Sequence, residues 1–262
     1  MSQATVNRRQ RIMAQLLDKK QVTVKELASV LDVSNATVRR DLRALADEQG
    51  LNLTHGGASL SQQRDYSYQA KALRATEAKS VVGRLAGGLV RDGDHIFLDS
   101  GTTCSEVVPH LKQKHDVTVL ANSARFAPEL EGTSAHLFMI GGEYRPARMD
   151  TVGPMAMASL NTIRGYIAFI GTDGINMEFG PSASDIESAH LHRQVVQNAS
   201  ATNLLVDHSK FGSASLFQIV DWSQIDQIVT DRAPPTEWVQ FFSEKKIDVV
   251  YPAAIDPEKS HP

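Results

Sequence analysis

The chain has 262 residues, of which 42% are hydrophobic and 22% charged, so it is long enough for one large and one small globular domain. Its single cysteine, Cys104, excludes a disulfide within the chain and is typical of a reducing compartment. The sequence contains neither a secretion signal nor an apolar run near membrane-spanning length, so we expect a cytoplasmic protein without membrane contact.

Charge is distributed unevenly along the chain. The net charge is −3, yet residues 1–58 carry nine Lys or Arg and six Asp or Glu, which makes this part +3 and leaves −6 for the remainder. A basic N-terminal part on an acidic body indicates that only the N-terminal part meets a polyanion.

The N-terminal part predicts three helices. Apolar residues recur at helical spacing from Ile12 to Leu17, and Thr23 is expected to cap a second, short helix. A tight turn at Asp32-Val33 precedes a third helix, which Ser34 caps and Gly50 ends. The buried stripe of this third helix is expected to be Val38, Leu42 and Leu45.

The third helix is the candidate DNA reader, because its outward face carries small and basic side chains. Short residues at its start let the helix enter the major groove, where arginines grip guanine or phosphate. Residues 51–55, closed by Gly56-Gly57, predict a hairpin wing. We therefore predict a winged helix-turn-helix over residues 1–58 that binds double-stranded operator DNA; the alternative is a solvated basic helix in a small bundle. The candidate DNA-binding residues are Ser34, Asn35, Thr37, Arg39, Arg40, Arg43 and, in the wing, His55.

The rest of the chain predicts a linker over 59–75, an effector-sensing domain over 76–252 and a loose tail over 253–262. A helical segment runs from about Tyr68 to Val90, weakened by Gly87-Gly88, and strands then alternate with helices, which implies a mainly parallel α/β domain. The expected strands are His95–Leu98, Val117–Ala121, His136–Ile140, Tyr166–Ile170, Ala201–Val206, Gln227–Thr230 and Asp248–Tyr251. The expected helices are Cys104–Leu111, Ala124–Leu130, Asp185–Ala199 and Thr236–Lys245.

Polar loops follow four of these strands, at Asp99–Thr103, Asn122, Gly141-Gly142 and Gly171–Gly174, and all but the one at Asn122 contain glycine. In parallel sheets, ligands bind beyond the carboxyl ends of the strands. Gly101 allows a sharp turn, and the free amides and hydroxyls that follow it suit a phosphate. Taken alone, the Asp99–Thr103 motif is equally well explained as a capped turn without a ligand, and single loops of this kind are more often plain turns.

A further motif places Asp207 and Lys210 close together after a buried strand. Such a pair binds a sugar hydroxyl and a phosphate or moves protons, and its alternative is a surface ion pair. His190 and His192 are two residues apart and diverge on a helix, so we expect a solvated helix face and no metal site. Cys104 is interpreted as a small helix residue and not as a nucleophile. No cofactor is predicted.

The N-terminal motifs resemble those of DeoR-type bacterial transcriptional regulators. The matching residues are Ser34-x-x-Thr37-Val38-Arg39-Arg40-Asp41-Leu42, followed by His55-Gly56-Gly57-Ala58. The resemblance implies that Asp41 is a structural partner of arginines and not a DNA contact. The wing is one residue short and lacks the arginine that family members usually carry before the histidine, so the expected DNA contacts lie on the recognition helix.

The later motifs look like signatures of the DeoR-type effector domain, which is similar in fold to ribose-5-phosphate isomerase and glucosamine-6-phosphate deaminase. The resemblance implies a phosphorylated sugar or related metabolite that weakens DNA binding. By position, Ser100 to Thr103 hold phosphate, while Asp173, Asp207 and Lys210 meet the sugar; His192 occupies the place of a family lysine. The expected effector-binding residues are Asp99, Ser100, Gly101, Thr102, Thr103, Asn122, Gly141, Gly142, Asp173, Asp207 and Lys210.

We therefore expect a repressor of a carbohydrate-metabolism operon and not an enzyme. One recognition helix reads too few bases, so a homodimer or homotetramer is expected. The alternative is a sugar-phosphate isomerase or deaminase with an accessory DNA-binding head, in which Lys210 with Asp207 or Asp173 carries enediol chemistry. An isomerase has no need of a recognition helix. A DNA-packaging protein fits poorly, because the acidic body adds nothing to that role.

Overall fold

The computed structural model describes residues 3–49, 51–60 and 68–252. Contacts divide the chain into two compact units, Met1–Thr76 and Glu77–Pro262, and each unit has hydrophobic core clusters of its own. The boundaries that we predicted at residues 58 and 75 stay a prediction. The predicted tail, 253–262, and the predicted helix end at Gly50 lie outside the described residues.

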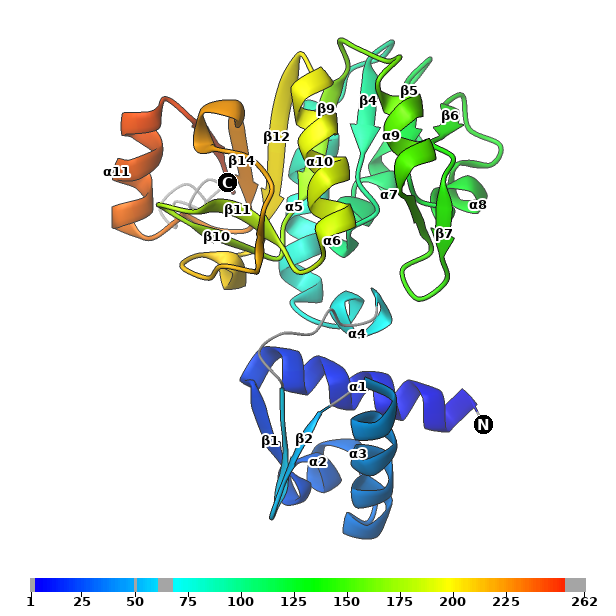
Figure 1. Ribbon diagram of the computed structural model, residues 1–262, viewed down its shortest axis with the longest axis vertical. Coiled ribbons are helices and arrows are strands. Elements are labelled where there is room, and N and C mark those ends of the chain that lie inside the picture. Colours follow the sequence, from blue (N-terminus) through cyan, green and yellow to red (C-terminus); the bar gives the residue numbers. More distant parts are fainter. Residues whose placement is uncertain (1–2, 50, 61–67, 253–262) are drawn as a thin grey trace, which may run out of the picture. The chain divides into compact units, whose positions relative to one another are not determined.

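The N-terminal unit is a winged helix-turn-helix (Figure 1). Its helices α1, α2 and α3 surround a core that contains the predicted stripe Val38, Leu42 and Leu45. Its three strands form one antiparallel sheet in the order β1-β3-β2. The elements are α1 Gln3–Lys19, β1 Gln21–Thr23, α2 Val24–Leu31, α3 Asn35–Gln49, β2 Asn52–Thr54, β3 Gly57–Ser59 and α4 Tyr68–Ala72.

The predicted continuous helix from Tyr68 to Val90 is wrong: it is two helices, α4 and α5 (Thr76–Leu89). Ala75 adopts a left-handed backbone conformation with φ of 49°, which ends the helical path between them. Ala70 of α4 is buried in the core of the N-terminal unit, so part of the predicted linker is structured. Gly87-Gly88 do not interrupt α5.

The C-terminal unit contains a seven-stranded sheet in the order β15-β14-β12-β9-β4-β5-β6, and every neighbouring pair is parallel. The chain starts at the centre with β4, moves outward to β6, and returns to the other side of β4 with β9. The order therefore reverses between β4 and β9. The strands are β4 His95–Leu98, β5 Thr118–Ala121, β6 His136–Met139, β9 Ile167–Gly171, β12 Ala201–Val206, β14 Gln227–Thr230 and β15 Asp248–Val250.

Successive side chains along a strand point to opposite faces of the sheet, and each face has its own hydrophobic core. Phe97 of β4 packs into the core on the side of α9 and α10, whereas Ile96 and Leu98 pack into the core with α5, α6 and α7. Figure 1 shows α9 and α10 in front of the sheet and the other three helices behind it. The helices are α6 Thr102–Ser105, α7 Val108–Leu111, α8 Phe126–Leu130, α9 Pro154–Leu160, α10 Ile186–Asn198 and α11 Thr236–Lys245.

The predicted strands agree with the sheet to within one residue at each end, but two features differ. The predicted helix Cys104–Leu111 is two one-turn helices, α6 and α7. Short antiparallel elements and α9 are present where no element was predicted. These strands are β7 Glu143–Arg145 with β8 Asp150–Val152, and β10 Gly174–Asn176 with β11 Gly180–Ala183 and β13 Phe217–Gln218.

Candidate nucleic-acid interface and effector site

Helix α3 presents the predicted polar face to solvent. The side chains of Asn35, Arg39, Arg40 and Arg43 are exposed, and Thr37 is partly exposed. The Ser34 hydroxyl accepts a hydrogen bond from the Thr37 backbone N–H at 3.2 Å, so Ser34 caps the helix as predicted. The result is a basic helix whose first turn carries only short side chains.

The preceding helix and turn fix the direction of α3. Thr23 and Glu26 form a reciprocal capping box at the start of α2. Asp32 then adopts a left-handed conformation, with φ of 52°, and its backbone N–H donates a hydrogen bond to the Ala28 carbonyl, which ends α2. This is the tight turn expected at Asp32-Val33, and it brings α3 across α2 as a helix-turn-helix requires.

Asp41 anchors the inner side of α3. The residue is 1% exposed, and its carboxylate accepts hydrogen bonds from Arg8 Nε at 2.5 Å and from Arg9 Nε at 3.3 Å. The expected structural role of Asp41 is therefore confirmed, and the ion pairs join α1 to α3.

The wing is a tight hairpin with His55 exposed at its turn. Gly57 has no room for a side chain, because a Cβ there would lie 1.9 Å from the carbonyl oxygen of Val22. Residues 51–57 contain no Lys or Arg, so His55 is the one titratable side chain that the wing offers to DNA.

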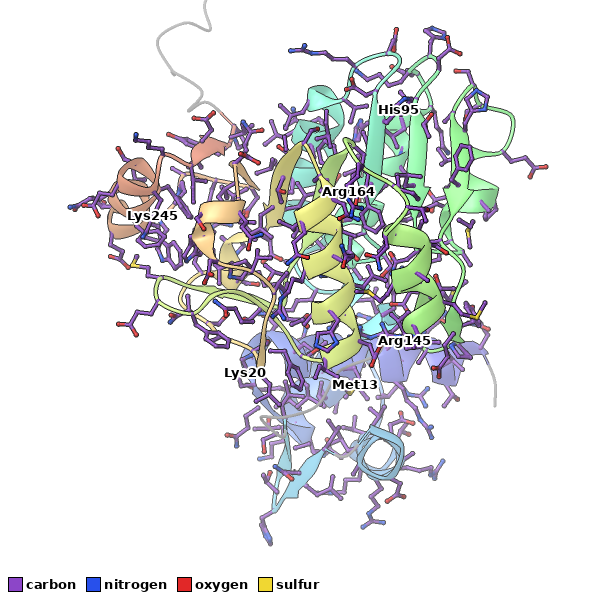
Figure 2. All side chains as sticks on the ribbon, turned by 45° about the horizontal axis from the view of Figure 1, so that its top comes forward. Met13, Lys20, His95, Arg145, Arg164 and Lys245 are labelled. Atoms are coloured by element: carbon purple, nitrogen blue, oxygen red, sulfur yellow. The ribbon has the colours of Figure 1, made fainter. Side chains whose placement is uncertain are left out.

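The effector-domain loops that we singled out meet at the carboxyl ends of the strands. Asp99 follows β4 and Gly171 ends β9, so the two flank the point where the strand order reverses. Oδ2 of Asp99 accepts a hydrogen bond from the Gly171 N–H at 3.2 Å. In open parallel sheets, ligands bind in the crevice that lies outside the carboxyl ends of the strands at such a reversal. Figure 2 shows Arg145 at this end of the layers and His95, which starts β4, at the opposite end.

Asp99 also binds His192, and here the prediction of a solvated helix face is wrong. His192 is 7% exposed, and its Nε2 lies 2.8 Å from Oδ1 of Asp99. The sequence carried a signal for this, because Ala189, His192 and Val195 share one face of α10 and the other two are apolar. His190, by contrast, is exposed as expected.

The buried pair shifts the pKa of each of its two groups. Burial by itself would raise the pKa of Asp99, but His192 and the amides of Gly171 and Gly101 outweigh it and lower the pKa to about 2. Burial would lower the pKa of His192, yet the Asp99 carboxylate raises it. Cys104 is fully buried, and its Sγ lies 3.9 Å from Oδ2 of Asp99. Burial and this carboxylate raise the pKa of the thiol, which favours the protonated, weakly nucleophilic form of Cys104.

Gly101 is required for a different reason from the expected one. Its φ of −61° is open to any residue, but a Cβ would lie 2.8 Å from Oδ2 of Asp99. The following helix, α6, has only one turn, so a phosphate in this loop would depend on amides and hydroxyls and little on a helix dipole. The Ser100 hydroxyl donates weakly to Asp99 and to Asp150, Thr102 is partly exposed and Thr103 is buried.

An arginine network that the sequence analysis missed borders this loop. Arg145 binds Asp150 through two hydrogen bonds, at 2.8 and 2.7 Å, and Asp185 at 2.8 Å. Arg148 binds Asp185 at 2.5 Å and the Ser188 hydroxyl at 2.7 Å. The signal in the sequence was the presence of two arginines, Arg145 and Arg148, shortly after the predicted Gly141-Gly142 loop. The network ties the β7–β8 hairpin to the start of α10.

Two predicted effector residues, Asn122 and Asp207, each leave a buried oxygen atom without a hydrogen-bond partner. Asn122 donates to the Thr151 carbonyl, but its Oδ1 accepts nothing. Asp207 accepts the Ser209 N–H at 2.9 Å through Oδ1, while its Oδ2 has no hydrogen-bond partner. Among the described residues, the buried side-chain oxygens without a hydrogen-bond partner are those of Asn122, Ser123, Asp207, Ser209 and Thr230, all in or after the last residues of β5, β12 and β14.

The remaining predicted residues, Lys210, Asp173, Gly141 and Gly142, also follow strands at this edge of the sheet. Lys210 is the leading cause that lowers the pKa of Asp207 against the effect of burial, and buried Lys79 of α5 contributes in the same direction. Asp173 accepts hydrogen bonds from the N–H and hydroxyl of Ser184 at 2.9 and 2.7 Å. Gly142, with φ of 154°, has no space for a Cβ beside Val152; Gly141 has open space around it.

Two absences concern only the described part of the chain. Residues 3–49, 51–60 and 68–252 include no group of three His, Cys, Asp or Glu placed to hold a metal ion. None of the helices in those ranges is long and apolar enough to cross a membrane.

A winged helix-turn-helix with an exposed basic reading face, carried by a chain whose second unit gathers polar loops at the carboxyl edge of a parallel sheet, defines a DNA-binding transcriptional regulator. Residues 8–64 match the model of the DeoR-like helix-turn-helix domain, and residues 74–232 match that of the DeoR C terminal sensor domain. The chain therefore belongs to the DeoR family.

Individual relatives agree with this assignment. The HTH-type transcriptional repressor GlcR of Bacillus subtilis is 31% identical over 232 residues, which cover 87% of this chain and 89% of GlcR. A putative aga operon transcriptional repressor of Escherichia coli O157:H7 is 30% identical over 252 residues, covering 94% and 93% of the two chains. A solved D-ribose-5-phosphate isomerase in complex with phospho-erythronic acid aligns over 52% of this chain and 54% of its own, with 14% identity and a TM-score of 0.39, a likeness that carries no functional argument.

Proposed function

We propose that this regulator represses a carbohydrate-metabolism operon in the cytoplasm and leaves its operator when it binds a phosphorylated sugar. The observation that carries the DNA-binding part is the exposed face of α3, with Arg39, Arg40 and Arg43 beside a short-chained first turn. The names of the relatives, among them an aga operon repressor and a lactose phosphotransferase system repressor, support the carbohydrate assignment.

Selection of bound duplexes from a random-sequence library, followed by mobility shift, tests the DNA-binding part. Arg40→Ala and Arg43→Ala are expected to weaken binding at least tenfold and to flatten its salt dependence, because each arginine releases counterions or reads a base. Arg91→Ala, an exposed arginine of the C-terminal unit, is the matched control. Failure to enrich any sequence at moderate salt, or equal loss for Arg91→Ala, contradicts the proposal.

The unsatisfied oxygens at the carboxyl edge support the effector part. Buried acceptors without partners are rare in folded proteins, and a ligand rich in hydroxyl groups supplies the missing donors. Ser100 to Thr103 with Gly101 are proposed to hold the phosphate. Asn122, Asp173, Asp207 and Lys210 are proposed to meet the sugar, and Asp99 with the loop glycines Gly141 and Gly142 shapes the crevice.

Thermal-shift measurements with phosphorylated sugars, the same sugars without phosphate, and inorganic phosphate identify the ligand class. A phosphorylated sugar is expected to raise the midpoint of unfolding, since a ligand that binds the native state stabilises it by mass action. Lys210→Ala is expected to remove most of this shift, and Lys112→Ala, an exposed lysine, to keep it. An unchanged shift in Lys210→Ala would remove Lys210 from the site.

We further infer that the crevice senses its ligand without converting it, and that the chain acts as a homodimer or homotetramer. The buried, protonated Cys104 thiol offers no nucleophile. Incubation with pentose and hexose phosphates is expected to yield no isomerised or deaminated product. Product formation that Asp207→Asn abolishes would restore the enzyme alternative.

A further inference from the structure

The two edges of the seven-stranded sheet differ in how they are protected. At one edge, β15 begins with exposed Asp248 and follows exposed Lys245 and Lys246, and such charges prevent an edge strand from pairing with another chain. The other edge, β6, reads His136-Leu-Phe-Met139 and lies in a run, 132–142, without Asp, Glu, Lys or Arg.

The outer side of β6 offers free pairing groups. Within the described residues, β6 is hydrogen-bonded only to β5. The amides of His136 and Ile140 point to β5, at Val117 and Ala121, so the backbone groups of Leu137 and Met139 point outward. They form a short row of donors and acceptors that another strand can continue.

Exposed apolar side chains lie beside this row. Phe138 is paired with Leu120 and therefore faces the α9 side of the sheet, yet it is 58% exposed. Met155 of α9 is 73% exposed, and α9 (PMAMASL) has no charged residue. Its Ala156 lies 3.0 Å from the position that a Cβ of Gly142, just after β6, would occupy, so the helix and the strand end are neighbours. Figure 1 shows α9 on the β6 side of α10.

We propose that β6 pairs antiparallel with β6 of a second copy of this chain. An antiparallel strand pair is compatible with a two-fold axis, which brings the same patch of both copies together. In a two-fold dimer each patch meets an identical patch, so any charged residue would face the same charge. This repulsion does not arise from β6 or α9, because neither element contains Asp, Glu, Lys or Arg. The proposal rests on the proposed function only in that an operator reader needs two recognition helices.

The alternation of backbone groups fixes the register. With Leu137 of one copy opposite Met139 of the other, the outward groups of both copies bond to each other. Phe138 then faces Phe138 of the partner subunit in a non-hydrogen-bonded pair, the type in which side chains come closest, with Cα atoms about 4.5 Å apart. Such a separation admits a disulfide between cysteines placed there.

Cysteine cross-linking tests the contact directly. Phe138→Cys is expected to give a covalent dimer under mild oxidation, and Leu216→Cys, at a position 67% exposed in the same unit, is expected to give none. Native Cys104 is fully buried and does not compete. Cross-linking of Phe138→Cys no greater than that of Leu216→Cys would overturn the proposal.

Sedimentation velocity supplies the second test. Phe138→Glu is expected to halve the sedimenting mass of the full chain, and Leu216→Glu to leave it unchanged. A folded Phe138→Glu that keeps the wild-type mass, or a wild-type chain that sediments at its monomer mass of 28.7 kDa at micromolar concentration, overturns the β6 assignment. The mobility-shift selection is a separate measurement. If the chain binds operator DNA but dimerises through a surface other than β6, the β6 proposal fails and the proposed function remains.

Discussion

At the scale of single residues, the buried Asp99–His192 pair links stability to pH. His192 has a raised pKa in the folded state, to which Asp185 adds and from which Arg148 subtracts, so its contribution is complete below its ordinary pKa of about 6.5 and is lost as pH rises through the raised value. Asp99, with its pKa of about 2, contributes fully above its ordinary value of about 4 and loses this only as pH falls toward 2. The pair is therefore strongest between about pH 4 and 6.5.

We expect the free energy of unfolding to fall as pH rises above 6.5, with a slope of up to about 1.4 kcal/mol per pH unit while His192 releases its proton. Denaturant titrations of the full chain between pH 6 and 9 measure this. His192→Lys stays charged throughout that range and should remove the slope, whereas exposed His190→Gln should retain it. Identical pH profiles for wild type and His192→Lys would show that the pair does not control stability.

Asp41 supports a second residue-scale prediction. Asp41→Asn leaves Arg8 and Arg9 without their shared carboxylate, and breaking a buried ion pair costs about 3 kcal/mol or more. We expect the N-terminal unit to unfold at a lower denaturant midpoint and operator affinity to fall with the folded fraction. Asp47→Asn, on the exposed side of the same helix, should change the free energy by less than about 0.5 kcal/mol. Equal effects of the two substitutions would contradict an anchoring role.

Residue roles were predictable where they follow from local pattern. The Ser34 cap, the stripe Val38, Leu42 and Leu45, and the Asp41 anchor involve neighbours within one small unit. His192 was misjudged because its partner, Asp99, is 93 residues away, and sequence spacing says nothing about which loop a helix faces in the folded sheet.

At the scale of elements, the packing of α5 on the α6–α7 segment depends on glycine. A Cβ on Gly83 would lie 2.4 Å from the backbone of Glu106, whereas Gly88 in the same helix has open space around it. Gly83→Ala is expected to destabilise the C-terminal unit by about 1–3 kcal/mol through overpacking. Gly88→Ala is expected to stabilise it by about 0.5–1 kcal/mol, because alanine favours a helix interior. Chemical denaturation of the two variants measures these changes in the free energy of unfolding. A change of the same sign for both variants would refute the close contact at Gly83.

Long strands were predictable from their apolar runs, and short antiparallel pairs were not. The inner strands of the parallel sheet are buried on both faces, so they read as continuous hydrophobic segments such as Ile167–Gly171. The pairs β7–β8 and β10–β11 have three or four residues each, with polar residues and glycines, and tertiary contacts hold them. The Arg145 network depends on the β7–β8 turn and was missed for that reason.

At the scale of the whole molecule, the two compact units are expected to unfold in two separate thermal transitions, because each has a core of its own. Operator DNA should raise the midpoint of the N-terminal transition, and the phosphorylated sugar that of the C-terminal one. If the sugar releases the operator, linkage demands reciprocity: each ligand must lower the affinity for the other by the same factor.

Calorimetric scans of the chain alone, with each ligand, and with both ligands measure that coupling. We expect the stabilisation with both ligands present to fall short of the sum of the separate effects by about 1–3 kcal/mol, the usual size of an allosteric coupling. Lys210→Ala should remove the shortfall together with the sugar effect, and Arg40→Ala should remove it together with the DNA effect. Full additivity in the wild-type chain would mean that the crevice and α3 act independently, and the regulator would then need a signal other than the sugar to leave its operator.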